Sequence, residues 1–279
     1  MASMSATAPS INLYQIAYSE ATREMVEPGY QILDNIDNPR PDWYEYWPIR
    51  RHLLNHSMEE DGLYGFFSPK FQEKTGLDVS SVRQFVAESA PNADVVIFSP
   101  QPDMGAFFLN VFEQGETFDP GLIVAYEQFL QAINRPVELR KLVMDSRQIS
   151  YSNYFVARPV FWREWLALNE AMFAMCEGPD TALKTILCQE TSYNGPSAPA
   201  QRKVFLIERA ASLLLVMQAK WRSVAHNPFN FGWSMSRFRE HPIEAYISDA
   251  LKVAYRENNY PQYLDAFSTV RERFIRSGN

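Results

Sequence analysis

The segment ADVVIFSP, residues 93–100, restricts the fold more than any other, because its apolar run has no polar face. A strand that is apolar at every position is buried on both faces, as happens in a sheet that carries helices on both sides. Other short apolar or alternating runs read as strands, namely INLYQIAY from residue 11, YQILDN from 30, LYGFF from 63 and NYFVA from 153. The sequence therefore predicts a sheet covered by helices.

Segments with apolar residues at helical spacing separate these strands and dominate the chain after about residue 160. One of them, QRKVFLIERAASLLLVMQ from residue 201, is apolar on most of its surface and predicts a single long central helix. Asp42 is a good N-cap for the helix that follows it. We expect the α/β class: a disordered leader over residues 1–10 and one domain over 11–279, with a mixed sheet, flanking helices and a helix-rich part from about residue 160.

Composition excludes several classes of protein. Hydrophobic residues make up 46% of the 279 residues, which is ample for a packed core, and the net charge of -7 argues against a protein that binds nucleic-acid phosphates. No apolar stretch approaches the roughly 18 residues that a membrane span requires, and the N-terminus lacks the features of a signal peptide. Two cysteines, Cys176 and Cys188, do not make a disulfide framework. We expect a cytoplasmic protein without a transmembrane segment, and leave oligomerisation open.

The standard catalytic signatures are missing from the sequence. There is no Gly-rich nucleotide-binding motif among only 11 glycines, and no G-x-S-x-G elbow. His52 and His56 are four residues apart and could share one face of a helix. A metal site would need further ligands, and the intervening glutamate of zinc proteases is lacking. We therefore expect surface or capping roles for both histidines.

Polar residues follow two of the predicted strands in a repeated pattern. The tripeptide Phe-Ser-Pro occurs at residues 67–69 and 98–100, which suggests two loops that open on the same edge of a sheet. Ligands of open α/β sheets lie beyond the carboxyl ends of the strands. Ser68, Lys70, Ser99 and Asp103 are therefore candidate site residues, although Pro-x-Pro-Asp is also ordinary turn chemistry.

Two further groups of charged residues allow two interpretations each. Asp34, Asp37 and Asp42 lie on a loop after a strand, where they are either site residues or solvated carboxylates. Glu208 and Arg209 interrupt an otherwise apolar helix, and burying them without partners would cost several kcal/mol. They form either a structural ion pair or a charged pair at the floor of a cleft, with the Glu208 carboxylate as a general base.

Four short motifs in this order resemble those of bacterial GT-A-like glycosyltransferases from capsule and lipopolysaccharide loci. They are the aromatic helix at residues 43–52, YGFFSPKF at 64–71, NYFVAR at 153–158 and FLIER at 205–209. The resemblance covers about two-thirds of the chain. It implies a single GT-A-like, Rossmann-like domain that transfers a sugar from a nucleotide-sugar donor to a surface-polysaccharide or glycolipid precursor.

The sequence departs from this pattern at the metal site. Such enzymes usually carry Asp-x-Asp after the aromatic helix, and its carboxylates bind Mn²⁺ or Mg²⁺ at the diphosphate. No Asp-x-Asp occurs anywhere in this chain, and Ser68 and Lys70 occupy the matching place. Either Lys70, with Arg50 or Arg51, neutralises the diphosphate without a metal, or Asp103 supplies a metal ligand from another strand. No cofactor is firmly expected, and Mn²⁺ or Mg²⁺ stays open.

The resemblance also suggests roles for the remaining candidates. The first strand and the loops beside it contact the nucleotide, which points to Gln15, Tyr18 and Asp34. Asn153 and Tyr154 match the place where such enzymes contact a hydroxyl group of the sugar. Glu208 would be the base, with Arg209 beside it, and Asp103 is the second candidate for that role. The alternative is a catalytically silent module of the same fold that binds or scaffolds other polysaccharide enzymes.

Overall fold

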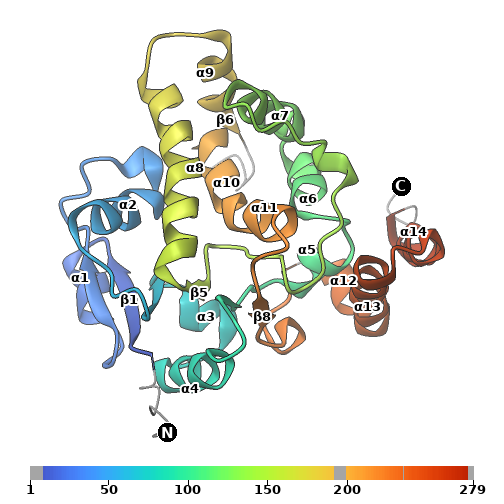
Figure 1. Ribbon diagram of the computed structural model, residues 1–279, viewed down its shortest axis with the longest axis horizontal. Helices are drawn as coiled ribbons and strands as arrows, with labels where there is room; N and C mark the ends of the chain where they lie inside the picture. Colours follow the sequence, from blue (N-terminus) through green and yellow to red (C-terminus); the bar gives the residue numbers. More distant parts are fainter. Residues whose placement is uncertain (1–8, 192–198, 235, 276–279) are drawn as a thin grey trace, which may run out of the picture.

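The computed structural model describes residues 9–191, 199–234 and 236–275, and most of the predicted leader lies outside these ranges. Its centre is a six-stranded sheet in the order β2-β1-β3-β5-β4-β8 (Figure 1). Only β5 runs antiparallel to its neighbours; the other strands run in one direction. The predicted mixed α/β sheet is confirmed. The strands are β1 (Ile11–Ala17), β2 (Gln31–Asp34), β3 (Leu63–Phe67), β4 (Val95–Ile97), β5 (Phe155–Ala157) and β8 (Ser223–Ala225).

Side chains of the central strands alternate between two apolar cores. In β3, Phe66 belongs to the larger core and Phe67 to the smaller one, as expected for neighbours on a strand. The smaller core is closed by α3 (Phe71–Thr75) and α4 (Val79–Ser89). The larger core includes residues of α2 (Tyr46–Asn55) and of α8 (Pro159–Glu177), the long yellow helix that runs from top to bottom in Figure 1. Central strands are therefore buried on both faces, as the run 93–100 predicts.

The remaining elements are mostly helical, as expected for the C-terminal part. They are α1 (Glu20–Glu24), α5 (Pro102–Ala106), α6 (Val111–Phe118), α7 (Leu122–Ala132), α9 (Ala182–Leu187), α10 (Arg202–Glu208), α11 (Ala210–Met217), α12 (Ser236–Arg239), α13 (Pro242–Asn258) and α14 (Pro261–Ile275). Short 3₁₀ turns are η1 (Pro41–Trp43), η2 (Leu139–Lys141) and η3 (Pro228–Asn230), and β6 (Glu190–Thr191) pairs with β7 (Ala200–Gln201). The predicted loop at 191–200 falls mostly outside the described residues.

Three predictions of local structure are wrong. The long helix from residue 201 is divided at Arg209, whose backbone N–H bonds the carbonyl of Leu206 three residues back instead of continuing the α-helical pattern. Asp42 lies within η1 and binds Arg40 and Lys203, so it does not cap α2. His52 is buried rather than on the surface: its ring stacks on His56, and burial lowers the pKa of His52 to about 4, with a smaller contribution from His56.

Lys252 of α13 is fully buried and joins the C-terminal helices to the end of α5. Its Nζ donates to the carbonyl oxygens of Gly105, at 2.7 Å, and of Phe108, at 3.0 Å. Burial lowers the pKa of Lys252 to about 8, although Asp249 and Asp145 oppose the shift. The folded state therefore loses this proton at a lower pH than the unfolded state does.

We predict that this difference makes stability rise with pH above 8, because the unfolded state then binds more protons than the folded state. Relative to Lys252→Met, the wild type should gain about 2 kcal/mol of unfolding free energy between pH 7 and pH 9.5. Urea unfolding at the two pH values measures this gain. The exposed Lys141 supplies a matched control, since Lys141→Met should keep the wild-type pH dependence. Parallel pH profiles for the wild type and Lys252→Met would contradict the prediction.

Candidate functional site

A cleft of about 930 Å³ opens at the edge of the sheet where β1 and β3 end and β5 begins. This is where ligands of open α/β sheets are expected. Its lining combines aromatic rings, hydroxyl and amide groups, two lysines and two glutamates. The polar and aromatic members are Tyr18, Thr22, Asn38, Trp43, Tyr44, Glu45, Tyr46, Ser68, Lys70, Lys74, Ser152, Asn153, Phe205 and Glu208.

The two Phe-Ser-Pro loops brace the segment that enters β5. Because β3 and β4 run in the same direction, both loops lie at one edge of the sheet, as the sequence suggests. The Ser68 hydroxyl lies 2.6 Å from the Tyr154 hydroxyl, and the Tyr151 N–H donates to the Ser99 hydroxyl at 3.0 Å. The two serines therefore hold the segment between Tyr151 and Tyr154 from either side.

This braced segment has an uncommon backbone. Ser152 and Asn153 are both left-handed, with φ of 58° and 53°. Glu208 accepts the Ser152 N–H at 2.6 Å, and the Lys74 ammonium donates to the Ser152 hydroxyl at 2.9 Å. The buried Asn153 side-chain oxygen finds no hydrogen-bond partner within the described part of the chain. Conformations and unpaired groups of this kind destabilise a fold and persist mainly at functional sites.

A second strained position lies on the other side of the cleft, between η1 and α2. Tyr44 has φ 47° and ψ -134°, a region that favours glycine and costs a tyrosine on the order of 1–3 kcal/mol. Just before it, the Arg40 guanidinium binds both Asp42 and Glu177, and Lys203 binds Asp42 at 2.8 Å. These ion pairs fix the corner against α8 and α10.

The charges in the cleft come from separate elements. Lys70 and Lys74 belong to the segment after β3, whereas Glu45 is the N-cap residue just before α2 and Glu208 ends α10. Burial raises the pKa of Glu45, and the Glu208 carboxylate raises it further, while Lys74 and Lys70 act in the opposite direction. Burial also raises the pKa of Tyr18, again with help from Glu45, so the phenol stays neutral. The cleft can therefore offer cationic groups, neutral donors and a carboxylate acceptor.

Five of the residues that the sequence nominates line this cleft, namely Tyr18, Ser68, Lys70, Asn153 and Glu208. Tyr154 is fully buried behind Ser68 and positions it. Gln15 lies on β1, three residues before Tyr18, so its side chain points to the opposite face of the sheet. There its side-chain oxygen accepts the Glu27 N–H.

The other candidates lie elsewhere. Asp34 is exposed at the end of β2 beside Arg23, and Arg50 binds Glu170 through two hydrogen bonds of 2.5 and 2.9 Å. The buried Arg209 donates to the carbonyl oxygens of Val111 and Phe205 and to the Gln114 side chain. Glu208 and Arg209 thus point to different places, which neither interpretation of the pair anticipated.

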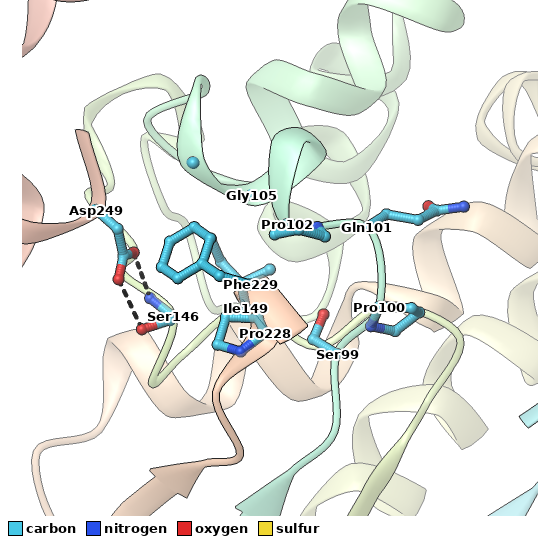
Figure 2. Close-up of a pocket in the computed structure, with 11 residues that line it drawn as sticks. Ser99, Pro100, Gln101, Pro102, Gly105, Ser146, Ile149, Pro228, Phe229 and Asp249 are labelled. Carbon is cyan, nitrogen blue, oxygen red and sulfur yellow. Dashed lines mark hydrogen bonds between the residues drawn. The ribbon is translucent and has the colours of Figure 1, made fainter. Parts of the chain in front are cut away.

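Ser99 on the second loop and Asp103 in the helix α5 that follows it do not line the cleft. Ser99 lines a small cavity of about 20 Å³, shown in Figure 2, where Asp249 accepts the Ser146 N–H and hydroxyl, both at 2.8 Å. Asp103 is fully buried in α5 and accepts the Ser234 N–H at 3.0 Å and the Ser234 hydroxyl at 2.9 Å. Its carboxylate is therefore used in fixing the chain before α12.

The residues of the cleft do not fit the divalent cation that the GT-A resemblance implies. Mn²⁺ and Mg²⁺ take several oxygen ligands, mainly carboxylates. The two glutamates of the cleft share it with Lys70 and Lys74, and Asp103 is buried elsewhere. Within the described ranges, there is no group of three or more His, Cys, Asp or Glu residues that could hold a metal ion.

Sequence reasoning missed Tyr44, Glu45 and Lys74. Lys74 is four residues after Lys70, a spacing that could have indicated a pair of cations on one short segment. Tyr44 and Glu45 carry no local signal, because their exposure to the cleft depends on the strained corner.

Comparisons with protein-family models, curated proteins and solved structures gave no match. Within the described residues, no helix has both the length and the apolar character needed to cross a membrane.

Proposed function

We propose that the protein is a glycosyltransferase that moves a sugar from a nucleotide-sugar donor to a hydroxyl group of a glycan or glycolipid acceptor. One observation carries the proposal: a single cleft combines two lysines, two carboxyl groups and a lining of hydroxyl, amide and aromatic groups. A ligand that matches it has an anionic part and a hydroxylated part. A nucleotide sugar has both.

Lys70 and Lys74 are suited to the diphosphate. When the bond between the sugar and the diphosphate breaks, negative charge builds up on the departing phosphate oxygens. Ammonium groups close to those oxygens stabilise that charge more strongly than they stabilise the intact donor. Lys74 is partly fixed by its bond to the Ser152 hydroxyl, and Lys70 is exposed at the start of α3.

Glu208 is suited to the role of general base. Its Oε1 accepts the Ser152 N–H at 2.6 Å, which fixes the carboxylate in the cleft. The acceptor hydroxyl oxygen would attack the anomeric carbon while the bond to the diphosphate breaks. The hydroxyl proton passes to Glu208, and the electron pair of the broken bond leaves with the nucleoside diphosphate.

We predict that nucleotides stabilise the protein through the two lysines. Thermal unfolding with UDP, GDP, CMP or dTDP, in EDTA, should show a rise with at least one of them, because a ligand at a hundredfold excess over its Kd adds about 2.7 kcal/mol. Lys70→Ala and Lys74→Ala should each weaken that nucleotide's binding roughly ten- to a hundredfold, the value of a charge-assisted hydrogen bond.

Lys141→Ala, which removes an equal charge from an exposed position on η2, is the matched control and should bind like the wild type. Binding only after Mn²⁺ or Mg²⁺ is added would contradict the role of the lysines. No stabilisation by any nucleotide, with or without those ions, would contradict the proposed function and favour the catalytically silent binding or scaffold module.

A further inference from the structure

The corner formed by Tyr44 and Glu45 is locally strained, and both of its residues line the cleft. Tyr44 adopts a backbone conformation that glycine would take without strain, and the residue is 39% exposed and outside the buried core, so little core packing offsets the strain. Glu45 occupies the N-cap position of α2 but makes no side-chain capping bond, and instead lines the cleft. A fold that holds both residues in this way indicates a role for their side chains in the cleft.

Titratable groups from several elements interact electrostatically with the Glu45 carboxyl group. They are Tyr18 after β1, Lys70 and Lys74 after β3, Glu208 on α10 and, behind Ser68, the buried Tyr154 before β5. Glu208 and burial together favour the neutral form of Glu45, which can donate a hydrogen bond as well as accept one. Next to it, the Tyr44 ring offers a flat apolar surface.

We propose that Tyr44 and Glu45 form the subsite for a pyranose ring of the acceptor, with the ring lying on Tyr44 and a ring hydroxyl hydrogen-bonded to Glu45. This inference rests on the proposed function and narrows it, because the acceptor would be a glycan with a sugar next to the reacting hydroxyl. The C–H groups on one face of a pyranose pack on an aromatic ring, and its hydroxyls pair with carboxyl and amide groups.

The lining of the cleft distinguishes this ligand from a lipid chain. An acyl chain requires predominantly apolar walls; Leu130, Leu168 and Leu213 supply such surface in the separate 530 Å³ groove, beside a few polar residues. The cleft beside Tyr44 instead carries the ionisable groups of Glu45, Lys70, Lys74 and Glu208 in its lining. A polyhydroxylated ring can hydrogen-bond to such groups, whereas an apolar chain would displace water from them without pairing them.

Saturation-transfer NMR with methyl α- and β-pyranosides of glucose, galactose, mannose and N-acetylglucosamine tests the subsite, with and without UDP or GDP. At least one glycoside should bind the wild type. Glu45→Ala and Tyr44→Gly should weaken that binding roughly tenfold, since they remove the hydrogen bond and the ring. Below the Glu45 pKa, Glu45→Gln keeps a donor like that of the protonated carboxyl group, and Tyr44→Phe keeps the ring, so both should then bind like the wild type. Binding to the wild type should also weaken as pH rises through the Glu45 pKa, and binding to Glu45→Gln should not.

The outcomes separate the two proposals. Equal binding by the wild type, Glu45→Ala and Tyr44→Gly would overturn the subsite, as would nucleotide binding with no glycoside binding at all, which leaves the proposed function standing. Glycoside binding that depends on Tyr44 and Glu45 without any nucleotide binding would uphold the subsite and overturn the transferase. Tyr44→Gly should fold at least as well as Tyr44→Phe, since glycine relieves the backbone strain, so circular dichroism of both variants checks that lost binding is not lost structure.

Discussion

Replacing Glu208 with glutamine is expected to lower the rate of sugar transfer by roughly 10²- to 10⁴-fold, the usual contribution of a general base. Glutamine has the size of glutamate, and its side-chain oxygen can still accept the Ser152 N–H that Glu208 holds at 2.6 Å. The segment before β5 should therefore keep its conformation. What the variant loses is the ability to take the acceptor proton.

The measurement is single-turnover transfer with a donor identified by the thermal-shift screen, together with nucleotide affinity. Nucleotide affinity should not fall, because Lys70 and Lys74, which would hold the diphosphate, are untouched. Glu88→Gln, at an exposed position on α4, is the matched control and should transfer at the wild-type rate. Full activity of Glu208→Gln would remove the base assignment and leave Glu45 as the next carboxyl group to test.

The fold was largely predictable because strand identity is local. The run 93–100 has no polar face, and LYGFF is bounded by turn residues, so β4 and β3 follow from patterns of a few residues. Strand β8 was not predicted: Ser223–Ala225 is half-buried, three residues long and exists through its pairing with β4. The break at Arg209 was also missed, since it follows from contacts with Val111 and Gln114 almost a hundred residues earlier.

The candidate site was predictable only where chemistry follows a strand or interrupts an apolar surface. Ser68 and Lys70 come directly after β3, and Glu208 breaks an apolar helix, so each carries a signal in the sequence. Arg50 appeared equally suitable as a phosphate ligand, but in the folded protein its guanidinium donates two hydrogen bonds to the Glu170 carboxylate. Tyr44 and Glu45 reach the cleft only through a strained turn held by Arg40 and Lys203, and no local pattern encodes such a turn.

The helix that ends at Glu208 begins at a buried ion pair, and this pair supports the largest stability prediction. The Arg202 guanidinium donates to both oxygens of Asp119, at 2.7 and 2.8 Å, and both side chains are about 5% exposed. Arg202 also bonds the carbonyl oxygens of Ile186 and Pro120. The pair thereby connects α10 to the turn between α6 and α7.

Asp119→Ala is expected to lower the unfolding free energy by about 3–5 kcal/mol, because Arg202 would remain charged and buried without its partner. Unfolding in guanidinium chloride measures the loss, provided that the dependence of the unfolding free energy on denaturant concentration is the same for the variant and the wild type. The double variant Asp119→Leu/Arg202→Met replaces both charges with apolar groups, and should recover most of the stability, since such replacements are often neutral. A loss below about 1 kcal/mol for Asp119→Ala would be typical of a surface pair and would contradict the burial argument. If the loss is large and the double variant recovers it, the pair stabilises the protein by avoiding an unpaired buried charge at the start of α10, the helix that carries Glu208 at its other end.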